Sequence, residues 1–327
     1  MYSVKELQEI IIAEIENRSG KLKKLEPSNL YSPVNYSLEI GGKRLRPVLL
    51  LLSYNLFSDD VKAALPAAVA IEVFHNFTLL HDDIMDKAEV RRNQPTVHKK
   101  FDENSAILSG DAMAFLAYKN LLECKSEGLI NVIKLFSDTA IEVCEGQQFD
   151  MDFETRLDVS ETEYLEMIRL KTAVLLACSL KVGALLANAD NKITNQLYEF
   201  GINLGLAFQL QDDLLDSFGD QNTFGKKIGG DILFNKKTFL LIKALENCLP
   251  AEKTELLSWI NRKDFVAEKK IKAVLDIYNR LNIKELTQMK IEYYIQKSTA
   301  ILQNISVGKN KTEALVELSN QVLKRNH

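Results

Sequence analysis

Residues 69–86 read Val-Ala-Ile-Glu-Val-Phe-His-Asn-Phe-Thr-Leu-Leu-His-Asp-Asp-Ile-Met-Asp, an apolar run that ends in a cluster of three aspartates. Strand-like alternation does not compete with helical spacing anywhere in the chain. Only 14 glycines and 6 prolines, the residues that punctuate sheet proteins, are present. The sequence therefore predicts an all-α fold in which helices pack on helices. Apolar-rich helical segments are expected at about 61–85, 105–124, 129–148, 161–187, 193–217, 236–248 and 266–280.

The chain of 327 residues is long enough for one large domain or two ordinary ones. Helical periodicity reaches both ends, in a stripe from Val4 to Ile15 and another from Leu315 to Val322. No internal repeat and no linker rich in proline, glycine or serine separates two halves. We therefore expect residues 1–327 to form a single domain.

Composition limits the partners of the chain. The formal charge of −4 and a pI of about 5.8 give no general attraction to nucleic acid or to an anionic membrane. The four cysteines are far apart, which favours reduced core thiols. The most apolar stretch, 173–189, contains Lys181 and falls short of the roughly 18 clean residues of a membrane span. These features predict a cytoplasmic protein without stable membrane insertion.

A second acidic cluster, Asp212-Asp213-Leu214-Leu215-Asp216, repeats the Asp-Asp-x-x-Asp pattern of residues 82–86. On a helix the outer two aspartates lie about one turn apart on one face, and the middle one points about 100° away. Oxygen ligands without histidine or thiolate suit Mg²⁺, which binds a few carboxylates together with substrate phosphates.

One such cluster could equally be a solvated surface turn, but two matching clusters favour a shared function. Six carboxylates facing one cavity would repel one another unless divalent cations neutralised them. The pair of clusters therefore predicts a metal site shared between two helices.

Basic residues point to phosphate binding. They occur in Gly41-Gly42-Lys43-Arg44-Leu45-Arg46-Pro47, in Arg91-Arg92, and again around 224–238 together with glycines. Arginine offers a fork suited to phosphate oxygens, and glycine lets the backbone approach an anion. Each stretch alone could be a solvated basic turn. Together they imply two anionic groups beside an acidic metal site.

At these motifs the chain resembles the trans-isoprenyl diphosphate synthase (polyprenyl synthetase) family. The resemblance implies a helical bundle of the isoprenoid synthase type around a deep central cavity, and a homodimer. It also implies Mg²⁺-assisted condensation of isopentenyl diphosphate, head to tail, with an allylic diphosphate (dimethylallyl, geranyl or farnesyl). The matching stretches are 41–47, 81–86, 91–92, 95–98, 110–111, 146–150, 171–172, 209–216, 225–231 and 236–238.

The resemblance assigns roles to individual residues. Three Mg²⁺ ions per active site would be held by Asp82, Asp83, Asp86, Asp212 and Asp216. The allylic diphosphate would be bound by Arg91, Lys171, Lys226 and Lys236, and the isopentenyl diphosphate by Lys43, Arg46, His75 and Arg92. The two adjacent arginines could exchange roles. The catalytic groups near the developing allylic cation would be Lys171, Thr172 and Gln209.

Several single residues keep two interpretations. His75 lies two turns before Asp82 on nearly the same helix face, so its ring could face the site or simply fill the core. Gln147 and Asp150 could point into the cavity or bond neighbouring helices. The lysine- and glycine-rich region 219–238 is expected to move and to close the site against water.

The resemblance also implies that product length depends on Phe74, Phe77 and Thr78, which precede the first aspartate motif by one to two turns. A phenylalanine five positions before Asp82 resembles the block of short-chain synthases. The motif also lacks a two-residue insertion, which favours the 20-carbon geranylgeranyl product over the 15-carbon farnesyl product. A longer-chain polyprenyl diphosphate synthase is the alternative.

Three other classes of protein were considered. A class I terpene cyclase would replace the second aspartate motif, and a non-catalytic partner subunit would lose aspartates or basic residues that are present here. A di-iron carboxylate bundle needs two Glu-x-x-His motifs. Only Glu72-Val73-Phe74-His75 has that spacing, so a di-iron site cannot be completed.

Overall fold

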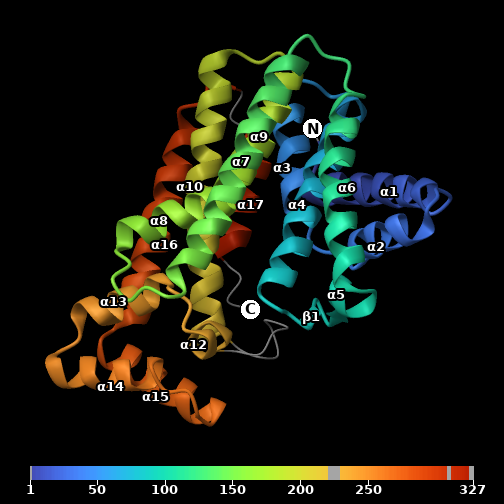
Figure 1. Cartoon of the computed structure of the whole chain (residues 1–327). Helices are drawn as coiled ribbons and strands as arrows, with labels where there is room; N and C mark the ends of the chain where they lie inside the picture. The colour runs from blue at the N-terminus through green and yellow to red at the C-terminus, as the bar shows by residue number, and fades with distance from the viewer. Residues whose placement is uncertain (1, 220–228, 308–310, 324–327) are drawn as a thin grey trace. The chain divides into compact units, whose positions relative to one another are not determined.

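The computed structural model describes residues 2–219, 229–307 and 311–323, and these are almost entirely helical (Figure 1). The prediction of an all-α fold is confirmed. In chain order the elements are α1 Val4–Leu22, α2 Ser28–Glu39, α3 Leu45–Asn55, the 3-10 turn η1 Val61–Ala64, α4 Leu65–Met85, β1 Val90–Arg91, β2 Gln94–Pro95, α5 Val97–Lys100, α6 Glu103–Leu121, α7 Leu129–Phe153, α8 Glu161–Ile168, the π-turn η2 Arg169–Ala173, α9 Val174–Leu186, α10 Asn191–Phe218, α12 Gly230–Phe234, α13 Phe239–Asn247, α14 Pro250–Ile260, α15 Ala267–Arg280, α16 Ile283–Gln303 and α17 Glu313–Leu323.

These elements form two compact units that alternate along the chain. Unit 1 comprises Met1–Ala140, Leu175–Glu199 and Ile301–Leu318, and unit 2 comprises Ile141–Val174, Phe200–Ala300 and Ser319–His327. Every dividing point falls inside a helix, in α7, α9, α10, α16 or α17, and not in a linker. The expectation of a single domain over 1–327 stays a prediction.

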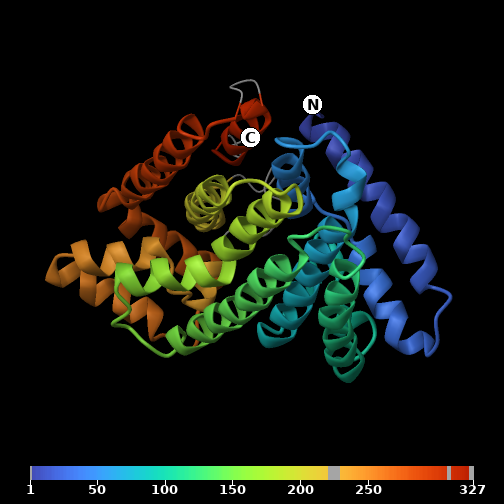
Figure 2. The same ribbon diagram turned by 90° about the horizontal axis from the view of Figure 1, so that it is seen from above.

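Unit 1 is built around α4, which packs along α6 and also contacts α3 (Figures 1 and 2). The first turns of α4 carry alanines and β-branched residues, and 67–71 are buried, so neighbouring helices can approach closely. Leu49–Leu52 on α3 are completely buried, which marks α3 as a central helix. Ser53 at its end donates a hydrogen bond of 2.6 Å to the Leu180 carbonyl of α9.

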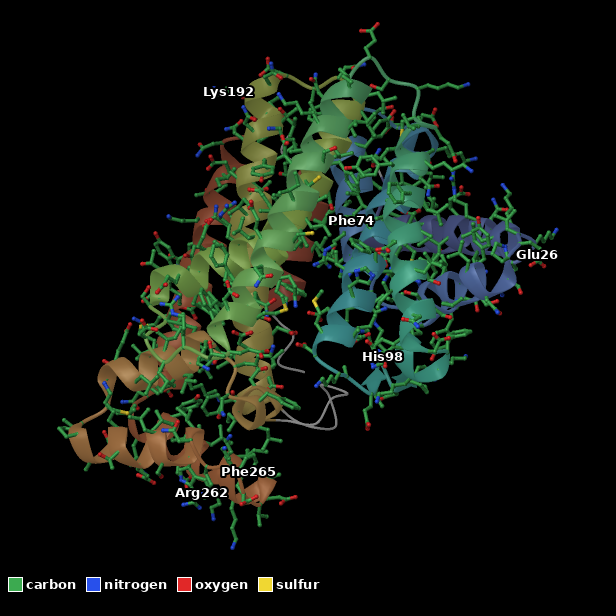
Figure 3. The ribbon with its side chains drawn as sticks, viewed as in Figure 1. Glu26, Phe74, His98, Lys192, Arg262 and Phe265 are labelled. Carbon is green, nitrogen blue, oxygen red and sulfur yellow. The ribbon has the colours of Figure 1, made fainter. Side chains whose placement is uncertain are left out.

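Unit 2 contains α8, η2, part of α10 and the group α12–α15, in which α15 contacts α12, α13 and α14. The helix α8 begins at a capping box formed by Ser160 and Glu163. The buried Lys270 of α15 donates hydrogen bonds to the Leu233 carbonyl and to Asn235, which ties α12 to α15. Its ammonium also lies 4.4 Å from the ring centre of Phe265, between α14 and α15 (Figure 3).

The helices α2, α3, α14 and α16 extend the helical content beyond the predicted apolar segments. In α2, α14 and α16 polar residues interrupt the apolar positions, and α2 also contains an internal proline. The helix α3 lies outside the predicted segments although its residues 48–52 are apolar and buried. β1 and β2 form a two-stranded antiparallel hairpin. Arg92 and Asn93 have φ values of 52° and 61°, the left-handed pair that a two-residue hairpin turn requires.

By length and composition the segment Val61–Met85 could cross a membrane, with a mean hydropathy of 1.5. The sequence analysis missed this segment because it took 173–189 as the most apolar stretch. In the structure 61% of the relevant window is buried inside the protein. A single, mostly buried helix of this kind is weak evidence for a membrane span, because the core helix of a water-soluble domain passes the same test.

Candidate active site

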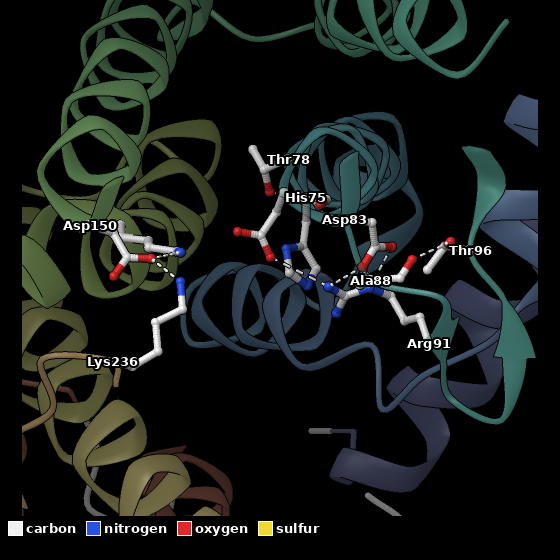
Figure 4. A network of polar contacts seen from close by, with 10 residues as sticks. His75, Thr78, Asp83, Ala88, Arg91, Thr96, Asp150 and Lys236 are labelled. Atoms are coloured by element: carbon white, nitrogen blue, oxygen red, sulfur yellow. Dashed lines mark hydrogen bonds and ion pairs between the residues drawn. The ribbon is translucent and has the colours of Figure 1, made fainter. Parts of the chain in front are cut away.

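The first aspartate motif stands at the end of α4, where its three carboxylates meet different surroundings. Asp83 is only 4% exposed, Asp82 is half-buried and Asp86 is exposed. Arg91 on β1 binds Asp83 with two nitrogens at 2.8 Å and reaches Asp82 at 3.4 Å (Figure 4). The middle aspartate therefore turns away from the outer two, as the helical spacing predicts, and an arginine holds it.

Burial raises the pKa of the Asp83 carboxyl, and the hydrogen bonds from Arg91 oppose that rise. Burial acts to lower the pKa of Arg91, but its bonds to Asp83 outweigh burial and the pKa is raised. The two groups thus form a partly buried, charge-assisted pair. Arg91 is a predicted ligand of the allylic diphosphate, and Asp83 fixes its guanidinium beside Asp82.

The second motif, on α10, follows the same plan. Asp213 is 6% exposed, whereas Asp212 and Asp216 are half-buried. The Tyr164 hydroxyl donates to Asp213 at 2.5 Å, and the Gln209 amide donates to its other oxygen at 2.9 Å. Burial raises the pKa of Asp213 to about 7. In both motifs the middle aspartate is buried and hydrogen-bonded to polar side chains, and the outer two aspartates are less buried.

The donor set suits Mg²⁺ bound together with a phosphate ligand. Within residues 2–219, 229–307 and 311–323 no group of three or more acidic, histidine or cysteine side chains is arranged to hold a metal. Mg²⁺ does not need such a group, since it is usually held by one or two carboxylates, waters and substrate phosphates. The outer pairs, Asp82 with Asp86 and Asp212 with Asp216, each offer two carboxylates of this kind. The first aspartate motif belongs to unit 1 and the second to unit 2. A cavity shared by both motifs stays a prediction.

The basic residues predicted to bind isopentenyl diphosphate gather in unit 1. The Arg46 guanidinium lies 3.1 Å from His75 Nε2, and Arg92, at the tip of the hairpin, donates to the Gly41 carbonyl. Lys43 is exposed on the same loop. A side chain at Gly42 would meet the Arg92 guanidinium at 2.5–2.7 Å, and its φ of 132° also favours glycine. The glycine at position 42 therefore allows the loop to lie directly against the Arg92 side chain of the hairpin.

His75 acts as a neutral hydrogen-bond partner at this cluster. Burial lowers its pKa well below the ordinary value, and the neighbouring positive charges, Arg46 first and then Arg92, lower it further. With Arg46 donating, His75 Nε2 accepts and Nδ1 carries the proton. The His75 ring is half-buried and contacts Arg46, a predicted ligand of isopentenyl diphosphate, and its own role toward that ligand stays a prediction.

In unit 2 the predicted allylic-diphosphate ligands Lys171 and Lys236 share one carboxylate. Asp150 lies 2.7 Å from Lys171 Nζ and 3.5 Å from Lys236 Nζ (Figure 4). Burial acts to raise the pKa of Asp150, but the two ammonium groups prevail and lower it. Asp150 therefore bonds to neighbouring elements, one of the two interpretations left open for it, and whether it also faces the substrate stays a prediction. Lys226 lies outside the described residues.

The π-turn η2 gives Lys171 and Thr172 their positions. Gly146 on α7 packs against this turn so closely that a side chain there would meet the Lys171 Cα at 2.7 Å. The Thr172 hydroxyl donates to Gln209 at 2.9 Å, and Gln209 in turn donates to Asp213. Thr172, Gln209, Asp213 and Tyr164 thus form one continuous chain of hydrogen bonds, which fixes the orientation of the Gln209 amide.

Tyr164 is a member of this chain that the sequence analysis missed. It lies in α8, far from Asp213 in the sequence, and its ring is buried. Its only signal in the sequence is an aromatic position in a helical stripe, which is indistinguishable from ordinary core packing.

The residues predicted to limit product length belong to an aromatic row in unit 1. Phe77 lies 5.3 Å from Phe74 and 4.8 Å from His81, measured between ring centres, and Phe74 lies 5.0 Å from Phe136. Phe74 is buried, whereas Phe77 is half-buried. The Thr78 hydroxyl donates to the His75 carbonyl of its own helix at 2.8 Å. Phe77 is therefore the ring in this row that is both braced by neighbours and partly open.

Comparison with known proteins agrees with this geometry. The family model of Polyprenyl synthetase matches residues 27–278. A geranylgeranyl diphosphate synthase from Methanosarcina mazei is 42% identical over 246 residues, covering 72% of this chain and 76% of the relative. A geranylfarnesyl diphosphate synthase from Natronomonas pharaonis is 39% identical over 252 residues, covering 72% and 74%. A crystal structure of a geranylgeranyl pyrophosphate synthase matches with a TM-score of 0.94 and 45% identity over 99% of both chains.

Proposed function

Because the chain belongs to the polyprenyl synthetase family and is a trans-prenyltransferase, we propose that it makes the 20-carbon geranylgeranyl diphosphate. It would do so by adding isopentenyl diphosphate head to tail to an allylic diphosphate. The observation that carries the prenyl-transfer reaction is the matched design of the two aspartate motifs. In each, two less buried carboxylates stand one turn apart beside a buried one.

The first task of the site is to hold a diphosphate as it leaves an allylic carbon. Mg²⁺, when bound, supplies Lewis-acid stabilisation of that leaving group. Asp82, Asp86, Asp212 and Asp216 would hold the ions, with Asp83 fixing Arg91 instead of binding a metal directly. Arg91, Lys171 and Lys236 add cationic groups that are held in place before the substrate arrives, by Asp83 and by Asp150. Such preorganised charge stabilises the transition state without reorganising during the reaction.

The second task is to guide the allylic cation to the double bond of isopentenyl diphosphate. Thr172 and Gln209 carry oxygens at the end of a buried hydrogen-bond chain and would stabilise positive charge nearby. Lys43, Arg46, His75 and Arg92 would hold the diphosphate of isopentenyl diphosphate. The proton lost after the new carbon–carbon bond forms would pass to the released diphosphate, so the chain needs no dedicated base.

Product length rests on Phe77 in this proposal. Its position five residues before Asp82 supports a short-chain product. Similarity alone does not choose the product, because the relatives include both 20-carbon and 25-carbon synthases by name. The longer product is the second candidate.

Purified protein supplied with Mg²⁺, isopentenyl diphosphate and farnesyl diphosphate should release diphosphate and form a 20-carbon prenyl diphosphate. Excess EDTA should abolish turnover, and added Mg²⁺ should restore it, because the outer aspartates need the ion to bind the substrate. Diphosphate release measures turnover, and chromatographic sizing of the dephosphorylated product measures its chain length. Extension of farnesyl diphosphate past 20 carbons to a 25-carbon product would refute the chain-length proposal and leave the reaction class intact. Extension of geranyl diphosphate to 15 carbons, with farnesyl diphosphate left unextended, would do the same.

A homodimer is part of the proposal. In unit 1, along α6 and at its C-cap, Leu108, Phe115 and Leu122 are exposed at a spacing of seven residues, with Phe115 76% exposed. Seven residues are nearly two helical turns, so the three side chains share one face. An exposed apolar stripe of this kind is typical of a protein–protein interface. The cytoplasmic location and the lack of a nucleic-acid partner stay predictions from composition.

Phe115→Asp should convert the dimer into a monomer of 37.0 kDa. The reason is that a charge at the centre of an apolar interface loses its hydration without gaining a partner. Light scattering after size-exclusion chromatography gives the mass. Leu249→Asp, which places the same charge on an exposed leucine of unit 2, is the control and should stay dimeric. A Phe115→Asp variant with the mass of the parent would exclude this stripe as the interface.

A further inference from the structure

The start of α3 meets α4 through two arginines: Arg44, the last residue before the helix, and Arg46, in its first turn. Arg44 Nη1 lies 2.5 Å from Glu72 Oε1, and Arg46 Nη1 lies 3.1 Å from His75 Nε2. Glu72 and His75 are three residues apart on α4, so they are neighbours on one face of that helix. The loop and the helix are thus paired at two adjacent points. The first point lies inside the protein, and the second lies at the cluster proposed to bind isopentenyl diphosphate.

The Arg44–Glu72 pair is deeply buried, with side-chain exposures of 6% and 3%. Each member of the pair makes a further hydrogen bond. Arg44 Nη2 donates to the Leu38 carbonyl, and Glu72 Oε1 accepts from Asn76 Nδ2 at 3.1 Å. Removal of two charges from water is expensive, and a well-packed apolar pair of similar size often gives equal stability. Stability alone therefore does not account for an ion pair at this place.

The backbone of the loop is held in an unusual shape around the same residue. Arg44 has φ 49° and ψ 38°, the left-handed region that residues other than glycine disfavour. The carbonyl groups before it are also fixed, since Gln8 Nε2 donates to the Lys43 carbonyl at 2.8 Å and Arg92 donates to the Gly41 carbonyl. The side chain of Arg44 points inward, while Lys43 beside it is exposed. The left-handed backbone at Arg44 thus directs the Arg44 side chain into the protein and leaves the adjacent Lys43 side chain exposed.

We propose that the Arg44–Glu72 ion pair is a positioning device for the isopentenyl diphosphate site. It fixes the register of the loop on α4, so that Arg46 meets His75 and Lys43 is presented to the ligand. Arg44 itself does not contact the substrate. The inference rests on the proposed function, in which Lys43, Arg46, His75 and Arg92 hold that diphosphate.

The test replaces the pair by an apolar one, in the double variant Arg44→Met with Glu72→Met. We expect it to fold with a melting temperature within a few degrees of the parent. We also expect the KM for isopentenyl diphosphate to rise about 10- to 100-fold, because displacement of binding groups by about 1 Å can cost that much. The KM for farnesyl diphosphate should change less than about twofold. A matched control, Lys23→Met with Glu39→Met, removes a surface ion pair of the same unit and should leave both constants unchanged.

The single variant Arg46→Ala distinguishes a wrong site assignment from a wrong positioning role. Arg46→Ala should itself raise the KM for isopentenyl diphosphate; if it does not, the assignment of the site has failed. If Arg46→Ala raises this KM but the double variant leaves it unchanged, the positioning role is overturned. Equal rises in both KM values would show a general structural role and would also overturn it.

Glu72→Gln covers the case in which the double variant does not fold. It keeps the hydrogen-bonding shape and removes the charge, and it should give a smaller, selective rise in the KM for isopentenyl diphosphate. Loss of the folded state in both variants, seen by circular dichroism, would show that the pair is needed for the fold itself and would refute the proposal.

Discussion

The double variant Asp82→Ala, Asp86→Ala should keep its fold and lose at least about 10³-fold of its kcat/KM, since removal of even one preorganised electrostatic group costs about 10²–10³. Asp82 is half-buried and Asp86 is exposed, so truncation of either leaves no fully buried cavity. Arg91 keeps its two bonds to Asp83 when Asp82 is removed. The expected loss is therefore one of metal and diphosphate binding, and not of structure.

The measurement is steady-state turnover over a range of Mg²⁺ concentrations, together with a thermal melt. Any residual activity should require much more Mg²⁺ than the parent needs. The control variant removes two other exposed acids of unit 1, Glu127→Ala with Asp138→Ala, and should behave like the parent. Full activity in the Asp82→Ala, Asp86→Ala variant would exclude these residues as metal ligands.

Phe77→Ala should lengthen the product by one or more five-carbon units beyond 20 carbons. On α4 its Cα stands about 7.5 Å before that of Asp82, at 1.5 Å of rise per residue. Its ring is braced by Phe74 on one side and His81 on the other, so it stays in place against a growing chain. Removal of this ring opens space where the growing prenyl chain is expected to end. The dephosphorylated products, separated by reversed-phase chromatography, report the change.

Phe77 is the better residue for this test because Phe74 is buried against Phe136. Truncation of a buried phenylalanine costs about 3–5 kcal/mol of stability, which would confuse the interpretation. As a control, Phe265→Ala removes a ring of unit 2 that Lys270 covers and should leave the product unchanged. If the Phe77→Ala enzyme is folded and active and still makes the parent product, Phe77 does not limit the chain.

In the aspartate motifs, helical spacing predicts the relative orientation of the carboxylates but not their partners. The pattern Asp-Asp-x-x-Asp on a helix predicts two outer carboxylates on one face and a middle one turned away. Asp83 and Asp213 are indeed the buried members of their motifs. The sequence grouped Asp83 with the metal ligands, and that role is untested. The structure places it on Arg91, a contact that depends on how the hairpin folds back.

The contacts that hold the binding groups in place were not visible in the sequence. Tyr164 bonds Asp213 across 49 positions of the chain, and Glu72 meets Arg44 across 28. A buried tyrosine and a buried glutamate each have many possible partners, and no spacing rule selects one. The sequence left the partners of Asp150 open for the same reason, and the structure shows them to be Lys171 and Lys236.

The sequence by itself determined the helical class, the two acidic motifs and the basic stretches, and through them the family and its reaction. These features depend on periodicity and residue type, which are local properties of a chain. Only the tertiary structure decided which carboxylate of each motif is buried, that His75 lies beside Arg46, and that Arg44 pairs with Glu72 and Asp150 with Lys171. These outcomes depend on burial and on charges brought together from distant positions, and both arise only when the chain packs.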